Sequence, residues 1–221
     1  MVVDLRDQRP LWAVPDETIA AIRDALPPDW QLSVVDEPVD GNADGGGGSA
    51  ASLAAIRGAE AYLGFGISPP LFAAATEGPQ SRLRWVHSAA AGVGSSLFPA
   101  MRASEVVLTN SAGIHASPMA EWAIAAILYF ARGLDFAIHA QAAATWNKAP
   151  FENPNTAVRE IAGATLGIVG LGGIGREIAT RAAALGMRVL ATRRTPGDAP
   201  AGVDRLFGPD GLDTLLSLIH I

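Results

Sequence analysis

Short apolar runs alternate with amphipathic stretches along the first half of the chain. A helix is expected at residues 16–26, where Asp16 can cap the first turn. Alternation of strands and helices predicts a parallel sheet with helices on both faces. Five runs have the length and composition of buried strands, at residues 11–14, 32–35, 61–65, 84–87 and 106–109.

The second half of the chain repeats this pattern in a shorter form. Strands are expected at residues 164–169, 187–192 and 203–206, followed by a helix at residues 210–216. A doubly wound dinucleotide fold needs two βαβαβ halves, so only the first half is expected here. Between the first two strands, one face of a helix is predicted from the spacing of four apolar residues, Ile174, Ile178, Ala182 and Leu185.

A third feature is a helix expected over residues 117–133, with Ser117 as its N-cap and Gly133 as its stop. It is apolar nearly all round, so we expect it to be buried, either between two domains or in a subunit interface. Its longest apolar stretch, residues 122–131, is too short for a bilayer span of about 20 residues.

Two segments read as connections. Residues 41–49 contain four consecutive glycines and indicate a flexible surface loop. The alternative of a phosphate loop is disfavoured because no Lys-Ser or Lys-Thr pair follows. Residues 147–160 are rich in proline and asparagine and indicate an exposed connection into the second unit.

A glycine-rich turn follows the strand at residues 164–169 and precedes a helix, the context that distinguishes a dinucleotide-binding turn from a ligand-free one. Gly170 allows the tight bend, Gly172 lets the backbone approach a pyrophosphate, and Gly175 lets helix and strand pack closely. The free N–H groups at the helix start then hold phosphates. The turn reads Gly170-Leu171-Gly172-Gly173-Ile174-Gly175.

The strand at residues 187–192 is followed by Arg193, Arg194 and Thr195. An NAD-specific site places a carboxylate about 20 positions beyond the glycine motif, where it binds the ribose 2′-hydroxyl. Guanidinium groups instead match a 2′-phosphate in geometry and charge. NADP is therefore favoured, with NAD as the alternative cofactor. The competing interpretation is that these arginines are a solvated strand end.

Several motifs together resemble the D-isomer-specific 2-hydroxyacid dehydrogenases. Residues 160–177 resemble that family's nucleotide-binding signature, and residues 85–94 its substrate loop. Residues 109–113, with Ala120 and Glu121, resemble its interdomain segment, and Trp146 stands where the family often has a tryptophan. The likeness extends from about residue 60 to about residue 216 and keeps the motifs in order.

The resemblance implies an α/β fold of two doubly wound parallel-sheet units. A flavodoxin-like substrate domain is expected at residues 1–112. A Rossmann nucleotide domain is expected at residues 113–221, incomplete and beginning with the interdomain helix 117–133. The implied reaction of the full-length protein is hydride transfer between NADP(H) and a small 2-hydroxy or 2-oxo acid, such as glyoxylate or hydroxypyruvate. A homodimer is also implied.

In the resembled family, a substrate loop binds the substrate carboxylate through backbone N–H groups, which here belong to Ala91, Gly92 and Val93. Gly94 departs from the family, which commonly has aspartate there. The family's catalytic arginine, glutamate and histidine are expected beyond residue 221, so no catalytic residue is assigned. The chain's own histidines are poor substitutes: His87, His115, His139 and His220.

These features predict a C-terminally truncated family member. The family pattern is lost after Ser217, which suggests the hypothesis that the last residues are a truncation artefact. Two other functional interpretations stay open. Some members use nucleotide binding to control partner assembly, and the chain as written could be a non-catalytic fragment.

Composition narrows the functional classes. Of the 221 residues, 49% are hydrophobic, ample for a core, and the net charge of −6 favours binding neither to nucleic acid nor to anionic membrane. The chain has no cysteine, which excludes disulfides and thiol nucleophiles and fits a reducing cytoplasm. Paired carboxylates and metal-ligand spacings are lacking, so no metal is predicted.

Overall fold

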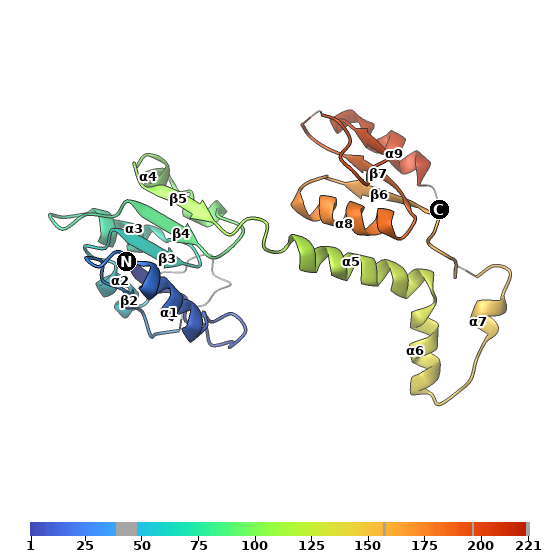
Figure 1. Cartoon of the computed structure of the whole chain (residues 1–221), viewed down its shortest axis with the longest axis horizontal. Coiled ribbons are helices and arrows are strands. Elements are labelled where there is room, and N and C mark those ends of the chain that lie inside the picture. Colours follow the sequence, from blue (N-terminus) through green and yellow to red (C-terminus); the bar gives the residue numbers. More distant parts are fainter. Residues whose placement is uncertain (39–47, 157, 196, 220–221) are drawn as a thin grey trace. The chain divides into compact units, whose positions relative to one another are not determined.

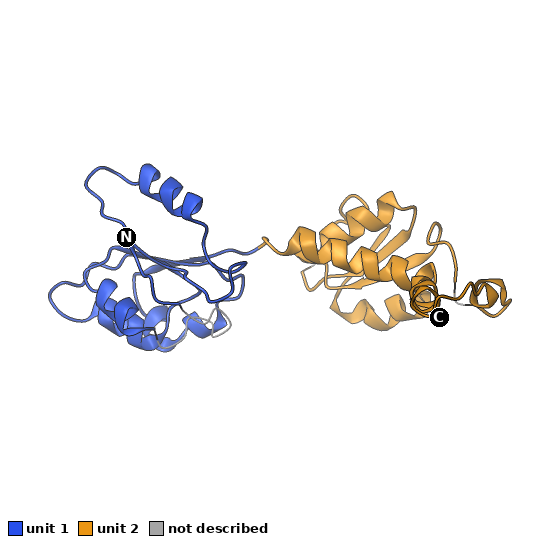
Figure 2. Ribbon diagram, turned by 90° about the horizontal axis from the view of Figure 1, so that it is seen from below, with its two compact units in different colours: residues 1–112 blue, residues 113–221 orange. Residues whose placement is uncertain are grey.

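The computed structural model describes residues 1–38, 48–156, 158–195 and 197–219. The chain divides into two compact units, Met1–Ala112 and Gly113–Ile221 (Figure 2). Each unit is an α/β structure built on an all-parallel sheet, which confirms the predicted fold class. Residues 41–47 of the predicted glycine-rich loop lie outside the described residues.

The first unit has a five-stranded sheet in the order β2-β1-β3-β4-β5, which is the flavodoxin-type order (Figure 1). Its strands are β1 (Val2–Asp4), β2 (Ser33–Val34), β3 (Ala61–Gly64), β4 (Trp85–Ser88) and β5 (Val107–Asn110). Its helices are α1 (Asp16–Ala25), α2 (Ala50–Ala55), α3 (Pro69–Thr76) and α4 (Pro99–Arg102), with a short 3-10 turn, η2 (Gly94–Ser96).

The predicted strand at residues 11–14 is wrong. The first strand is β1, whose Val3 is fully buried between β2 and β3, whereas Leu11 is 94% exposed in a turn. A strand of only three residues is too short for its pattern to stand out, and it ends in a buried acid, Asp4.

The buried carboxylate of Asp4 has a partner in the neighbouring strand. Tyr62 of β3 donates its hydroxyl to Asp4 Oδ2 at 2.8 Å. Burial, and then the nearby carboxylate, raise the pKa of Tyr62.

Helix α1 begins differently from the prediction. Asp16 is its first helical residue and Pro15 is the N-cap, so no side chain caps the first turn. Ile19 of α1 packs with Val3 and Leu5 on one face of the sheet. A larger cluster that includes Ile56, Leu71, Val86 and Met101 forms the main core of this unit.

The second unit has a three-stranded sheet in the order β6-β7-β8, flanked by helices on both faces (Figure 1). Its strands are β6 (Thr165–Val169), β7 (Arg188–Thr192) and β8 (Arg205–Phe207). Helix α8 (Gly173–Ala184) packs on one face with the cluster around Val189 and Ala191. A 3-10 turn, η3 (Pro209–Gly211), leads into α9 (Leu212–Leu218), which packs on the other face with Leu190 and Phe207.

The buried face of α8 agrees only in part with the one predicted: Ala182 is buried and Ile178 packs against the core, whereas Leu185 is 39% exposed. Ile174 is 42% exposed, whereas Gly175, Ala179 and Ala182 are buried. Small side chains on this face let α8 lie close to its sheet. Helix α5 (Ala116–Ala131) packs against α8 and adds Ile124 to the same core.

Helix α5 is mostly exposed or half-buried within its own unit, so its burial between two domains or in a subunit interface stays a prediction. Its N-cap is His115 rather than Ser117, and of its residues only Ala120 is buried, whereas Trp122 is 70% exposed and Phe130 is 67% exposed. Its end agrees with the prediction, because Gly133 follows in the left-handed region with a φ of 67°.

Two further helices, α6 (Leu134–Ala142) and α7 (Ala149–Glu152), lead from α5 toward β6. Within the described ranges, no single helix has the length and apolar character of a membrane span. Helices α5 and α6 reach that length and composition only when taken together, across a bend of 73°.

Candidate functional site

The glycine turn between β6 and α8 depends on two backbone positions. Gly170 has a φ of 95°, a left-handed conformation that L side chains rarely adopt. A Cβ atom added at Gly175 would lie 2.6 Å from the carbonyl oxygen of Gly170 and 3.2 Å from Ile168 Cγ2. Both contacts are closer than ordinary packing. Glycine at these positions therefore lets α8 begin directly against the end of β6.

This arrangement leaves the first amides of α8 open. Gly172 is the N-cap and no side chain caps the helix. Arg176 donates its N–H to Gly172 O at 3.0 Å, whereas no hydrogen bond joins the N–H groups of Gly173, Ile174 or Gly175 to any other described residue. A Cβ atom added at Gly172 would meet nothing within 4 Å. Open amides at a helix N-terminus favour an anion such as a phosphate.

The end of β7 holds the turn in place. Gly170 donates its N–H to Thr192 Oγ1 at 3.2 Å, and Leu171 donates to Thr192 O at 2.8 Å. Arg193 in turn donates its N–H to Phe207 O in β8 at 3.0 Å. The residues that follow Thr192 are therefore placed beside the glycine turn by backbone hydrogen bonds.

A pocket of about 900 Å³ lies at this junction. Six of the eight residues predicted to bind the cofactor line it: Gly170, Gly172, Gly173, Arg193, Arg194 and Thr195. The other two, Ile174 and Gly175, are not among its lining residues. Sequence reasoning missed Leu171 and Arg176, which also line the pocket.

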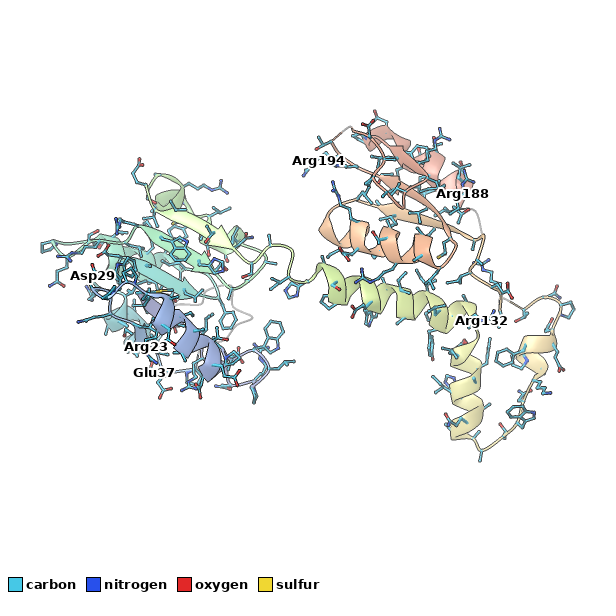
Figure 3. All side chains as sticks on the ribbon, viewed as in Figure 1. Arg23, Asp29, Glu37, Arg132, Arg188 and Arg194 are labelled. Atoms are coloured by element: carbon cyan, nitrogen blue, oxygen red, sulfur yellow. The ribbon has the colours of Figure 1, made fainter. Side chains whose placement is uncertain are left out.

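The pocket is strongly basic although the whole chain has a net charge of −6. Three of the described residues that line it are arginines, and no described lining residue is an aspartate or a glutamate. Arg194 follows the end of β7 and lines the pocket, whereas Arg188 at the start of the same strand does not (Figure 3). Guanidinium groups beside an open helix N-terminus suit a ligand with more than one phosphate.

The predicted substrate loop lies in the first unit, directly after β4. Asn110 Nδ2 donates to Ala91 O at 2.5 Å, and Ala90 donates its N–H to Ser88 Oγ at 3.2 Å, so the loop is pinned at its base. In the part of the chain that the structure describes, the N–H groups of Ala91, Gly92 and Val93 have no hydrogen-bond acceptor. Such a run of backbone donors can bind a carboxylate.

Comparison with known proteins agrees with this geometry. Residues 124–220 match the NAD binding domain of the D-isomer specific 2-hydroxyacid dehydrogenases. A structure of a D-isomer specific 2-hydroxyacid dehydrogenase family protein from Aeromonas salmonicida superimposes with a TM-score of 0.70 at 25% identity, covering 97% of this chain and 60% of that one. Residues 124–220 therefore belong to this domain family, and the chain as a whole is similar to its members.

Curated relatives in the family match a shorter segment. A hydroxypyruvate reductase from Thermotoga maritima is 33% identical over 105 residues, 47% of this chain and 33% of that protein. A glycerate dehydrogenase from Methylorubrum extorquens is 40% identical over 74 residues, 32% of this chain and 23% of that protein. The matched segments therefore span a third or less of these two relatives.

His87 and His139 have ordinary hydrogen-bond partners among the described residues. His87 is half-buried, with Nδ1 at 2.8 Å from Thr109 Oγ1 and Nε2 at 3.2 Å from Ser111 Oγ. His139 Nδ1 lies 2.6 Å from the carbonyl oxygen of Asp135 in its own helix. Among the described residues, no group of three or more histidine, aspartate or glutamate side chains could hold a metal ion.

Replacing Gly175 by alanine tests the close contact between α8 and β6. Gly175→Ala should lower the free energy of unfolding by about 1–3 kcal/mol, because the added methyl group overlaps the Gly170 carbonyl. Gly173→Ala is the matched control. Its Cβ would lie 3.9 Å from Ala116 Cβ, so a neutral or slightly stabilising effect is expected. Urea unfolding of both variants measures the difference, and equal stabilities would contradict the close contact.

Proposed function

We propose that this chain holds the adenosine-phosphate part of the cofactor site of an oxidoreductase. The enzyme transfers a hydride between NADP(H) and a small 2-hydroxy or 2-oxo acid. One observation carries the proposal: the open amides of a glycine turn and three arginines line a single pocket. A helix N-terminus alone would suit any anion, whereas this pocket has room and charge for several phosphate groups.

The backbone amides and the side chains of the pocket bind different phosphate groups of the cofactor. The N–H groups of Gly173 and Ile174 bind the pyrophosphate, because they lack partners within the protein. Arg193, Arg194 and the Thr195 hydroxyl bind the 2′-phosphate of the adenosine ribose. NADH is disfavoured because the lining residues include no carboxylate to accept the ribose 2′-hydroxyl.

The substrate loop after β4 is the proposed binding site for the substrate. Backbone N–H groups of Ala91, Gly92 and Val93 bind the substrate carboxylate. The nicotinamide ring of a bound cofactor supplies the hydride, while the protein orients the reactants and excludes water. The names of the two curated relatives, a hydroxypyruvate reductase and a glycerate dehydrogenase, support small hydroxy acids as the substrate class. We assign no catalytic acid or base to this chain.

A turnover assay on the complete protein that contains this chain tests the reaction. Incubation with NADPH and glyoxylate or hydroxypyruvate should consume NADPH and yield an equal amount of the corresponding 2-hydroxy acid. NADH should support a slower reaction at equal concentration. Tight NADPH binding without turnover on any small 2-oxo acid would contradict the enzyme and favour a nucleotide sensor instead.

Replacing Arg193 by aspartate tests the cofactor preference. Arg193→Asp should weaken NADPH binding by about 1.5–3 kcal/mol, because it removes a charge-assisted contact to the 2′-phosphate. The new carboxylate should strengthen NADH binding and so reverse the preference. Arg188→Asp makes the same charge change at the far end of β7 and should leave the preference unchanged. Fluorescence titrations with both cofactors measure this, and equal or tighter NADH binding by the unmodified protein would refute the role of Arg193.

A further inference from the structure

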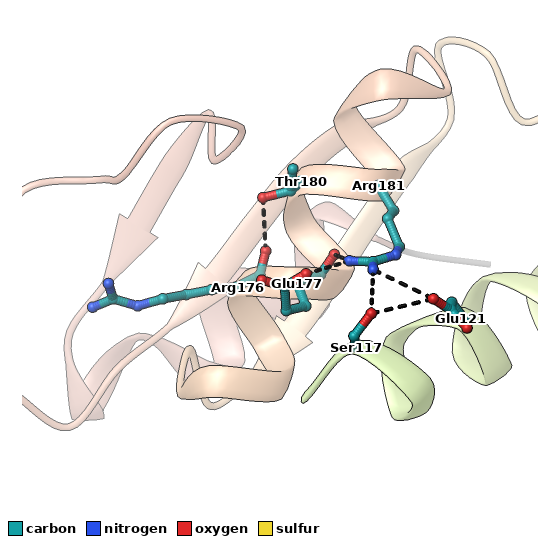
Figure 4. A network of polar contacts seen from close by, with 6 residues as sticks. All are labelled: Ser117, Glu121, Arg176, Glu177, Thr180 and Arg181. Atoms are coloured by element: carbon teal, nitrogen blue, oxygen red, sulfur yellow. Dashed lines mark hydrogen bonds and ion pairs between the residues drawn. The ribbon is translucent and has the colours of Figure 1, made fainter. Parts of the chain in front are cut away.

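Two arginines of helix α8 have very different surroundings. The Arg181 guanidinium contacts the carboxylates of Glu177 and Glu121, and its Nη2 donates to Ser117 Oγ at 2.7 Å. The Arg176 guanidinium makes no hydrogen bond or ion pair with any described residue, and it extends away from this network (Figure 4). One arginine is used within the protein, whereas the other is available to a ligand.

The network around Arg181 also binds the carboxylates of Glu177 and Glu121. Glu177 is the residue after Arg176 along the helix, and its carboxylate is bound by Arg181. Glu121 of α5, the other acid of this network, is also turned to Arg181, at 3.7 Å. The positive charge of Arg176 is therefore not neutralised by either acid.

Arg176 lines the same pocket as Arg193 and Arg194. Three like charges around one pocket repel one another, and no acidic lining residue offsets them. An anion bound among them relieves this repulsion and forms charge-assisted hydrogen bonds. The pocket is therefore arranged for an anionic group that side chains bind, in addition to the phosphates that backbone amides bind.

We propose that Arg176 is a specificity-determining residue that binds the 2′-phosphate of NADP(H) as a third guanidinium. This inference rests on the proposed function. Under the proposed function, the open N–H groups of Gly173 and Ile174 bind the pyrophosphate, so it does not need this side chain. The 2′-phosphate would offer three acceptor oxygens to the arginines that line the pocket, of which Arg193 and Arg194 follow β7.

Calorimetric titration of the 221-residue chain tests this with two small ligands. Adenosine 2′,5′-bisphosphate carries both the 5′- and the 2′-phosphate, whereas adenosine 5′-monophosphate carries only the first. Arg176→Gln should weaken binding of the bisphosphate about tenfold or more and change binding of the monophosphate less than about twofold. Arg176→Lys should recover part of the loss, because lysine restores the charge without the paired donors.

Arg188→Gln is the matched control, since Arg188 is exposed at the start of β7 and is not among the residues that line the pocket. It should leave both affinities unchanged. Equal losses for both ligands in Arg176→Gln, or no loss for either, would overturn the inference while leaving the roles of Arg193 and Arg194 intact. An unmodified chain that binds the two ligands equally, or binds neither, would overturn the cofactor proposal and this inference together.

Discussion

The close approach of helix α8 to the end of strand β6 is the constraint on which the site depends. A side chain at Gly175 would overlap the carbonyl oxygen of Gly170 at 2.6 Å, so the contact exists only because this residue has no Cβ. It places the uncapped start of α8 beside the pocket, which Gly172 and Gly173 line. It also places Arg176, the next residue, at the pocket's edge.

A second element determines which residues lie beside the glycine turn. Thr192 binds two amides of this turn, so the end of β7 and the turn are held together. Under the proposed function, the residues after Thr192 are the ones that bind the substituent on the adenosine ribose. In this chain those residues are basic. Arg181 pairs with Glu121 of α5 and with Glu177 of α8, and neither acid is among the residues that line the pocket.

The sequence predicted the fold class, because alternating apolar runs and amphipathic stretches are local patterns that the parallel sheets preserve. It failed where a decisive feature was short or depended on packing. Strand β1 has only three residues and ends in a buried acid, so its pattern is weaker than that of the apolar run at residues 11–14. Helix α8 buries small residues rather than its largest apolar ones, because they permit its close approach.

The residues of the candidate site were likewise predictable only in part from the sequence. The glycines and Arg193, Arg194 and Thr195 were accessible from spacing, because each follows the end of a strand. Their roles stay predictions. Arg176 could not be found from the pattern, since in sequence it resembles Arg181, and only their different partners separate the two.

A crystal structure of the protein with NADPH would test the proposed cofactor site. We expect the pyrophosphate on the amides of Gly173 and Ile174, and the 2′-phosphate within hydrogen-bond distance of Arg193 and Arg194. A 2′-phosphate that faces solvent, or an adenosine bound away from this pocket, would contradict it.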